Sequence, residues 1–460
     1  MENIIDYINK NKKRYVDELT DFLKIPSISN NPENKPDMLD AAKWVENQLK
    51  SVGLENVKIY ETDGHPVVYG DWLKAGKDKP TILVYGHYDV QPVDPIELWS
   101  NPPFEPVIKD NIIYARGATD DKGQLFIHIK SIEAHIRNTG KLPVNVKVLI
   151  EGEEEIGSPN LSKFLKNQSK LLASDYVVIS DTSMYAPDLP SICYGLRGLA
   201  FMQIDIVGPN RDLHSGSYGG GVNNPINALA HIISKLKDDN GKILIPGFYD
   251  DVILLSDNER EEYEKLPFDD EGFKKNLEID EIFGEEGYST KERISGRPTL
   301  DCNGIWGGYQ GEGAKTVLPS KAGAKVSMRL VQNQQPEKIE KLFIDYVNKI
   351  SPKSVKVNAR ALHSGKGSMT AIDTPAIKAA KVALQKGFNV EPVFMREGGS
   401  IPIVNSFKEI LGADAILLGF GLADENAHSP DEHYDLSNFH RGILSIAYYL
   451  TELENLEKYK

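Results

Sequence analysis

Hydrophobic residues recur at helical spacing near the start of the chain. Ile4 and Ile8, then Leu19 and Leu23, stand four positions apart among charged residues. This spacing predicts amphipathic helices packed against a core. A further helix is predicted over residues 37–52.

Beyond residue 53 the pattern changes to short apolar runs bounded by turn residues. The runs that predict strands are 57–60, 67–70, 82–85, 144–150 and 176–179, and a helix is predicted over 123–138. Strands that alternate with helices over this length are typical of an α/β domain with a largely parallel sheet.

The pattern changes again near residue 198. Residues 199–207 alternate as a half-buried strand, 225–236 have helical spacing, 237–298 are charged and irregular, and 317–330 are strand-like. These features predict an antiparallel sheet with helices on one face.

In the last part of the chain, predicted helices again alternate with a strand, as in the first 198 residues. Helices are predicted over 374–387 and 436–456, with a strand over 415–420 between them. The simplest interpretation is a discontinuous α/β domain, residues 1–198 and 366–460, interrupted by an inserted α+β domain, residues 199–365.

The composition of the chain argues against several classes of binding partner. The 460 residues include 53 Lys and Arg against 67 Asp and Glu, a formal charge of −14. This acidity argues against a nucleic-acid partner. Uninterrupted apolar runs stay well short of the ~20 residues of a membrane span, and the N-terminus does not have the pattern of a secretory signal. Two cysteines, Cys193 and Cys302, are too few for a disulfide framework and are expected to be buried packing residues. We therefore expect a cytoplasmic protein with no membrane partner.

Polar side chains follow the predicted strand 82–85. His87 and Asp89 stand two positions apart, so their side chains point to the same side of an extended chain. A carboxylate placed in this way can orient a metal-ligating imidazole. A His-x-Asp pair at a strand end is also an ordinary polar turn.

Two further acidic clusters have competing interpretations. Asp120 and Asp121 stand between glycines just before a predicted helix, where they can cap the helix or bind a cation. Glu153, Glu154 and Glu155 directly follow the apolar strand 144–150. Charge runs are usually solvated faces, but the carboxyl edge of a buried strand is where open α/β sheets bind ligands.

Asp181 follows strand 176–179, and His428 lies in a loop after strand 415–420. Five polar clusters thus stand at the same kind of position. Two histidines and several carboxylates without a thiolate suit Zn²⁺ or Mn²⁺ with open positions for water. The sequence has no G-x-S-x-G nucleophile motif.

Nine ordered motifs between residues 81 and 435 carry a family resemblance. They are GHYDVQP, RGATDDKGQ, EGEEEIGSP, ISDT, DLHSG, AKTVLP, MRL, REGGSIP and NAHSPDE. Together they resemble the co-catalytic di-metal peptidases, the family of cytosolic non-specific dipeptidase, carnosinase and succinyl-diaminopimelate desuccinylase. The similarity is greatest to the dipeptidase branch.

The resemblance implies two divalent metal ions per subunit, Zn²⁺ or alternatively Mn²⁺. It implies that one metal is held by His87 and Asp181 and the other by Glu155 and His428, with Asp120 bridging both. Asp89 would orient His87, and Glu154 would be the general base that takes a proton from water at the metals. Family members commonly have a cis peptide at the position of Asp120–Asp121.

The resemblance also assigns roles in the inserted domain, which would act as a lid and dimerisation domain. His214 would stabilise the oxyanion in the site of the partner subunit of a homodimer. Arg329 and Ser400 resemble residues that receive the C-terminal carboxylate of the substrate, and Thr316 resembles another substrate contact. From position alone, His214 could instead cap a glycine-rich turn and Arg329 could form a surface ion pair.

The predicted function is metal-dependent hydrolysis of dipeptides or short peptides with a free C-terminus. The alternative within the family is an amidohydrolase that removes acyl groups from amino acids. A binding protein of the same fold without catalytic activity is a third hypothesis, which the intact Glu154 and metal ligands argue against.

Overall fold

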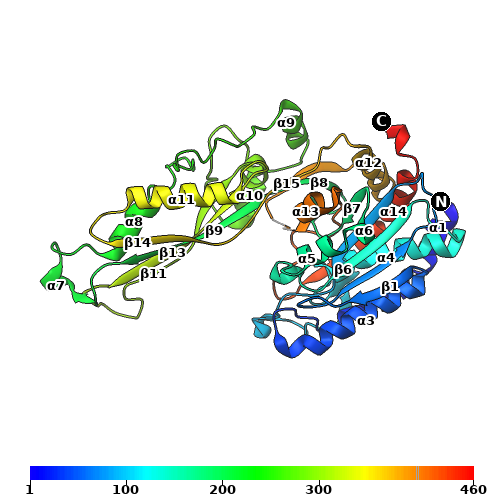
Figure 1. Cartoon of the computed structure of the whole chain (residues 1–460), viewed down its shortest axis with the longest axis horizontal. Helices are drawn as coiled ribbons and strands as arrows, with labels where there is room; N and C mark the ends of the chain where they lie inside the picture. Colours follow the sequence, from blue (N-terminus) through cyan, green and yellow to red (C-terminus); the bar gives the residue numbers. More distant parts are fainter. Residues whose placement is uncertain (400, 402, 460) are drawn as a thin grey trace. The chain divides into compact units, whose positions relative to one another are not determined.

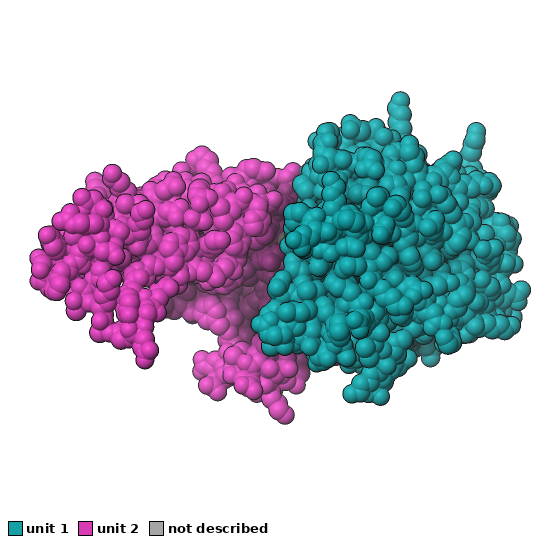
Figure 2. Space-filling view, turned by 90° about the horizontal axis from the view of Figure 1, so that it is seen from below, with its two compact units in different colours: residues 1–194, 370–395, 403–460 teal, residues 195–369, 396–402 magenta. Residues whose placement is uncertain are grey.

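The computed structural model describes residues 1–399, 401 and 403–459, and the chain divides into two units. Unit 1 comprises Met1–Tyr194, Thr370–Met395 and Ile403–Lys460, and unit 2 comprises Gly195–Met369 and Arg396–Pro402. Figure 2 colours the two units separately. The catalytic and lid roles expected for the two parts of the chain stay predictions.

A mixed sheet has most of its strands in unit 1 (Figure 1), whereas its strand β15 falls in the residue range of unit 2. Within the described residues it has nine strands in the order β1-β2-β6-β3-β7-β17-β8-β15, with β16 also paired to β8. The strands are β1 Glu55–Tyr60, β2 Val67–Trp72, β3 Thr81–His87, β6 Asn145–Glu151, β7 Tyr176–Ile179, β8 Ser191–Leu196, β15 Ser368–Met369, β16 Val393–Glu397 and β17 Asp414–Leu417.

The sheet is parallel only at its centre. β6, β3, β7 and β17 run parallel to their neighbours in this group, whereas β1–β2, β2–β6, β8–β17 and β8–β15 pair antiparallel. The α/β class predicted from the sequence is confirmed, and the antiparallel pairs lie toward the edges.

Both faces of this sheet are covered. Ile82 and Val84 of β3 share a core with Leu125 of the following helix, whereas Tyr85 packs edge-on against Phe407 at 5.1 Å between ring centroids. A strand buried on both faces has few positions for polar residues, which explains the continuous apolar runs in the sequence.

Unit 1 also contains the following α-helices. They are α1 Glu2–Lys10, α2 Lys12–Leu23, α3 Lys35–Val52, α4 Lys122–Thr139, α5 Leu161–Asn167, α6 Ser169–Leu172, α12 Pro375–Phe388, α13 Ile403–Ser406 and α14 Leu436–Leu453. α3 ends where Gly53 adopts a φ of 99°, a left-handed conformation that glycine tolerates. The long helices lie within one or two residues of their predicted positions at most ends.

A small antiparallel sheet in unit 1 brings two distant segments together. β5 Ile112–Tyr114 pairs with β4 Val107–Lys109 on one side and with β18 His433–Asp435 on the other. Tyr114 is the register partner of His433. The turn that follows β5 therefore lies beside the loop that precedes β18.

Unit 2 contains an antiparallel sheet in the order β11-β13-β9-β14. Its elements are β9 Gly198–Val207, β10 Leu213–His214, α7 Ser215–Tyr218, α8 Pro225–Ile233, α9 Asp257–Glu264, α10 Asp270–Leu277, β11 Thr299–Gly307, β12 Val317–Leu318, β13 Lys321–Leu330, α11 Pro336–Ile350 and β14 Lys356–Gly365. Alternate residues of β9 are buried in a core shared with α8 and α11, as the alternating sequence predicts.

Two details of unit 2 differ from the prediction. The charged stretch 237–298 contains the short helices α9 and α10. Cys193 is buried as expected, but Cys302 is exposed, so the prediction was wrong for that residue. The register of edge strand β11 shifts between Cys302 and Gly304, and such a bulge redirects side chains.

None of the described helices is both long and apolar enough to cross a membrane.

Candidate metal centre

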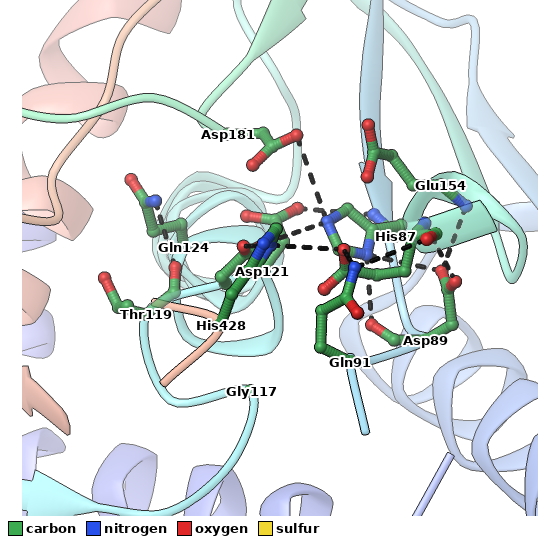
Figure 3. Close-up of polar contacts among 12 residues, drawn as sticks. His87, Asp89, Gln91, Gly117, Thr119, Asp121, Gln124, Glu154, Asp181 and His428 are labelled. Carbon is green, nitrogen blue, oxygen red and sulfur yellow. Dashed lines mark hydrogen bonds and ion pairs between the residues drawn. The ribbon is translucent and has the colours of Figure 1, made fainter. Parts of the chain in front are cut away.

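The polar residues predicted from strand ends come together at one edge of the unit 1 sheet (Figure 3). His87 is the last residue of β3, Glu154 and Glu155 follow β6, and Asp181 follows β7. Because β6, β3 and β7 are neighbouring parallel strands, their carboxyl ends meet at the same edge.

Asp120 and His428 reach this edge from the small sheet. Asp120 lies in the turn after β5, and His428 lies in the loop before β18. The pairing of β5 with β18 brings the two segments together across more than 300 residues of sequence.

Asp120 is at the centre of the cluster. Its Oδ1 lies 3.2 Å from Nε2 of His87, and its Oδ2 lies 2.9 Å from Nε2 of His428. Asp181 lies 3.9 Å from the same His87 nitrogen, and Glu155 lies 3.2 Å from the same His428 nitrogen. Two groups of three donors, His87–Asp120–Asp181 and Asp120–Glu155–His428, thus share Asp120.

Asp89 contacts both sides of the cluster. Its Oδ1 lies 3.3 Å from Nδ1 of His87 and also accepts a hydrogen bond from the backbone N–H of Glu154 at 3.3 Å. Its Oδ2 accepts one from the N–H of Glu155 at 3.1 Å. A buried carboxylate therefore ties the imidazole to the turn that presents the two glutamates.

The alternative interpretations of the acidic runs do not hold. Glu153 is buried and accepts hydrogen bonds from Asn160 and from the N–H of His65, so the glutamate run is not a solvated face. Asp121 stands at the N-cap of α4, but its side chain makes no capping bond and instead accepts the N–H of His87 at 3.3 Å. The Asp120–Asp121 peptide is cis.

The charges in the cluster perturb one another strongly. Burial raises the pKa of Glu154 to about 8; the His87 charge opposes this shift and the carboxylates of Glu155 and Asp120 add to it. Burial, with the charge of Asp120, raises the pKa of Asp181 well above its usual range. Carboxylates crowded in this way destabilise one another unless cations compensate them.

The donor set fits divalent metal ions. Nε2 of His87 is buried and makes no hydrogen bond within the described residues, yet it faces the carboxylates of Asp120 and Asp181. Two imidazoles and three carboxylates, with one carboxylate shared, are ligands that Zn²⁺ and Mn²⁺ accept.

Gln91 was not anticipated from the sequence. Its Nε2 donates to Oε2 of Glu155 at 2.7 Å and so fixes this carboxylate. The sequence does contain a pattern that indicates Gln91, because this residue continues the series His87 and Asp89 at every second position, so the three side chains of an extended chain point to the same side.

The remaining predicted residues are not in this cluster. His214, Thr316 and Arg329 belong to unit 2, and Ser400 lies outside the described residues. Within unit 2, β10 pairs with β12, and the Thr316 carbonyl accepts the N–H of Ser215. His214 and Thr316 are therefore neighbours.

The alternative interpretation of His214 as a turn cap has direct support, since its Nδ1 accepts the N–H of Gly216 at 3.1 Å. Its side chain is otherwise exposed. Arg329 is partly buried on β13, and burial lowers its pKa.

The fold and the cluster together define a candidate metalloenzyme. The model of the family described as peptidase family M20/M25/M40 matches residues 83–452. The chain belongs to this family and is a peptide-bond hydrolase, and the resemblance seen in the motifs is confirmed.

Relatives of the chain include a metallodipeptidase, a dipeptidase and a metallo-carboxypeptidase. The Cys-Gly metallodipeptidase of Schizosaccharomyces pombe is 34% identical over 473 aligned positions, covering 99% of both chains. The human Beta-Ala-His dipeptidase is 30% identical, covering 99% of this chain and 93% of the relative. The structure of the metallo-carboxypeptidase Sso-CP2 from Sulfolobus solfataricus matches with a TM-score of 0.84 and 34% identity, over 96% of this chain and 99% of that chain.

Proposed function

We propose that this protein is a dipeptidase that uses two divalent metal ions to hydrolyse dipeptides or short peptides with a free C-terminus. The observation that carries the proposal is the position of Asp120. Each of its two carboxylate oxygens faces a different histidine nitrogen, at 3.2 Å and 2.9 Å. One carboxylate between two imidazoles is the arrangement of a bridging ligand.

In this proposal His87 and Asp181 would hold one ion, Glu155 and His428 would hold the other, and Asp120 would contribute to both. The three ligand carboxylates carry three negative charges against the four positive charges of two dications, so the loaded site attracts anionic groups. Zn²⁺ is the expected ion and Mn²⁺ the alternative, because both accept mixed imidazole and carboxylate ligands.

Bound divalent cations would lower the pKa of water and polarise the carbonyl of the scissile bond. Glu154 serves as the general base, taking a proton from the attacking water and passing it to the leaving amine. The backbone N–H groups of Glu154 and Glu155 both donate to Asp89, but the contacts with Gln91 and His428 involve the carboxylate of Glu155 and not that of Glu154. This difference supports separate roles for the adjacent carboxylates, one as a ligand and one in proton transfer.

Residues of unit 2 supply substrate recognition in this proposal. Arg329 receives the C-terminal carboxylate together with Ser400, and Thr316 provides a further contact. Burial lowers the pKa of Arg197 to about 10, and the positive charge of Arg329 adds to this effect. Two neighbouring guanidinium groups favour an anion between them.

We further propose a homodimer in which His214 stabilises the oxyanion in the site of the other subunit. The exposure of the His214 side chain supports a role outside its own core. The names of the relatives, two dipeptidases and a carboxypeptidase, support cleavage next to a C-terminal residue. The cytoplasmic location stays a prediction.

The test is a substrate panel on metal-stripped protein reloaded separately with Zn²⁺ and Mn²⁺. The panel contains dipeptides, tripeptides, the same dipeptides with amidated C-termini, and N-acyl amino acids. We expect cleavage of dipeptides, with kcat/KM reduced for the amidated forms because Arg329 loses its ionic partner. Cleavage of N-acyl amino acids but not of dipeptides would show the amidohydrolase instead.

Oligomeric state is tested in the same preparation. Sedimentation of the active protein should give a dimer, and a fully active monomer would exclude a role for His214 between subunits.

A further inference from the structure

Glu432 is a buried carboxylate that the proposed chemistry does not use. Its side chain is 0% exposed. Its Oε2 accepts hydrogen bonds from Nη1 of Arg116 at 2.7 Å and from the N–H of Gly117 at 2.9 Å. Its Oε1 accepts them from the N–H groups of Thr119 and Asp120, at 3.0 Å and 3.1 Å.

All of these donors belong to one short turn, residues 116–120, which carries Asp120. Glu432 itself stands four residues after His428, in the loop before β18. A single side chain therefore joins the segment that presents Asp120 to the segment that presents His428. Asp120 and His428 are the two candidate metal ligands whose side chains approach each other to 2.9 Å in the cluster.

The loop needs such an anchor. Asn426, His428 and Asp431 all have positive φ, at 57°, 62° and 58°. Residues with a Cβ adopt this left-handed conformation uncommonly, although Asn, Asp and His do so more readily than others, and it persists where surrounding contacts hold the backbone.

Two further contacts join the same segments. Oγ1 of Thr119 donates to Oε2 of Glu425 at 2.7 Å, and Nε2 of Gln124 donates to the carbonyl of Thr119 at 3.0 Å. Oε1 of Gln124 accepts the N–H of Phe420 at 2.6 Å. Figure 3 shows the Gln124 and Thr119 side chains beside the cluster. None of these three hydrogen bonds involves the Glu432 carboxylate.

We propose that Glu432 is a positioning residue that holds Asp120 and His428 in the relative positions needed to bind the metal ion they share. This inference rests on the proposed function, because it assumes that the cluster binds metal. Two segments that are held in place before the ion arrives lose less freedom on binding. Groups that orient metal ligands in this way typically contribute about 10–100-fold to metal affinity or activity.

The geometry requires a carboxylate. Each oxygen of Glu432 accepts two N–H donors. In Glu432→Gln, one oxygen becomes an NH₂ group that faces two donors, so these hydrogen bonds are lost. Glu432→Asp keeps the charge but is shorter by one methylene and cannot reach both pairs of donors.

The experiment measures Zn²⁺ affinity directly, by titrating metal-free protein in competition with a chromogenic chelator. The matched control is Glu452→Gln, because Glu452 is also buried in unit 1 and accepts bonds from Lys386, Lys458 and Tyr459. Thermal unfolding of each metal-free variant records the loss of stability. We expect Glu432→Gln to weaken binding of one Zn²⁺ by about 10–100-fold, and Glu452→Gln to lower stability with unchanged affinity.

The outcomes separate this inference from the proposed function. If the parent protein does not bind two Zn²⁺ ions, the proposed function is refuted. A parent that binds two ions, with a Glu432→Gln variant of equal affinity, would remove only the role of Glu432. That role is also removed if Glu452→Gln weakens binding as much, because the effect is then general destabilisation. If Glu432→Gln does not fold, Glu432→Asp decides, and affinity equal to the parent would overturn the inference.

Discussion

Replacing Asp89 with asparagine keeps the shape of the side chain and converts one carboxylate oxygen into an NH₂ group. Asp89 and His87 are both fully buried. The two carboxylate oxygens accept the N–H groups of Glu154 and Glu155, and Oδ1 also lies 3.3 Å from Nδ1 of His87. Whichever way the asparagine amide turns, its NH₂ group faces at least one backbone N–H.

The magnitude follows from that lost contact. A hydrogen bond to a charged acceptor contributes about 1.5–3 kcal/mol, which corresponds to about 10–150-fold in an equilibrium constant. The lost bond holds the turn that presents Glu154 and Glu155, and the lost charge stabilises the orientation of His87. We therefore expect Asp89→Asn to reduce metal affinity and kcat/KM by about one to two orders of magnitude.

The assay is Zn²⁺ competition titration together with dipeptide kinetics on the reloaded enzyme. Asp71→Asn is the control, since Asp71 is a buried carboxylate on β2 that accepts bonds from Tyr69 and Asn56. The control should lose stability but keep metal affinity. If Asp89→Asn binds Zn²⁺ and turns over within about twofold of the parent, the positioning role deduced from these contacts is wrong.

Three further predictions follow from the site and its surroundings. Glu154→Gln should lower kcat by about 10²–10⁴-fold while two metal ions remain bound, as measured by metal analysis of the purified variant; unchanged kcat would exclude Glu154 as the base. Zn²⁺ at ~100 times the Kd of a site should add about 2.7 kcal/mol, for each site that it fills, to the free energy of unfolding of the metal-free protein, and denaturant titration without any such shift would argue against a site formed only in the folded state. Although burial opposes ionisation of Glu452, hydrogen bonds from Lys386, Lys458 and Tyr459 lower its pKa to about 2 from 4.5. The unfolded state then binds the proton first, so the stability that Glu452 contributes is fully present above pH 4.5 and is lost as the pH falls toward 2. The difference in unfolding free energy between the parent and Glu452→Gln should shrink over this range, and a constant difference would refute the assignment.

Much of the candidate site could be predicted because its residues stand next to recognisable strands. His87, Glu155 and Asp181 each follow an apolar run, and the carboxyl ends of parallel strands converge wherever the strands are neighbours. Glu432, Glu425 and Gln124 could not be found in this way. Their role depends on hydrogen bonds across about 300 positions of sequence, and no local pattern encodes such partners.

In the fold, too, some features could be predicted from local sequence and others could not. The spacing of apolar residues predicts the bounds of α3, α4 and β7 to within a few residues of those in the structure. This works because an element that buries one face or both faces must carry apolar residues at fixed intervals. The direction of a strand such as β8, which pairs antiparallel with β17, leaves no comparable signal, since strand direction depends on the path of the connecting chain.

By itself, the sequence determined the long helices, the central strands, the α/β class and the residue types of the candidate metal ligands, because local spacing and residue type carry that information. Only the tertiary structure decided that the two oxygens of Asp120 face His87 and His428. It also decided that Glu153 is buried away from this role while Glu154 and Glu155 are held by Asp89. These outcomes depend on which strands are neighbours and on the pairing of β5 with β18, a long-range contact that fixes distances between residues far apart in the chain.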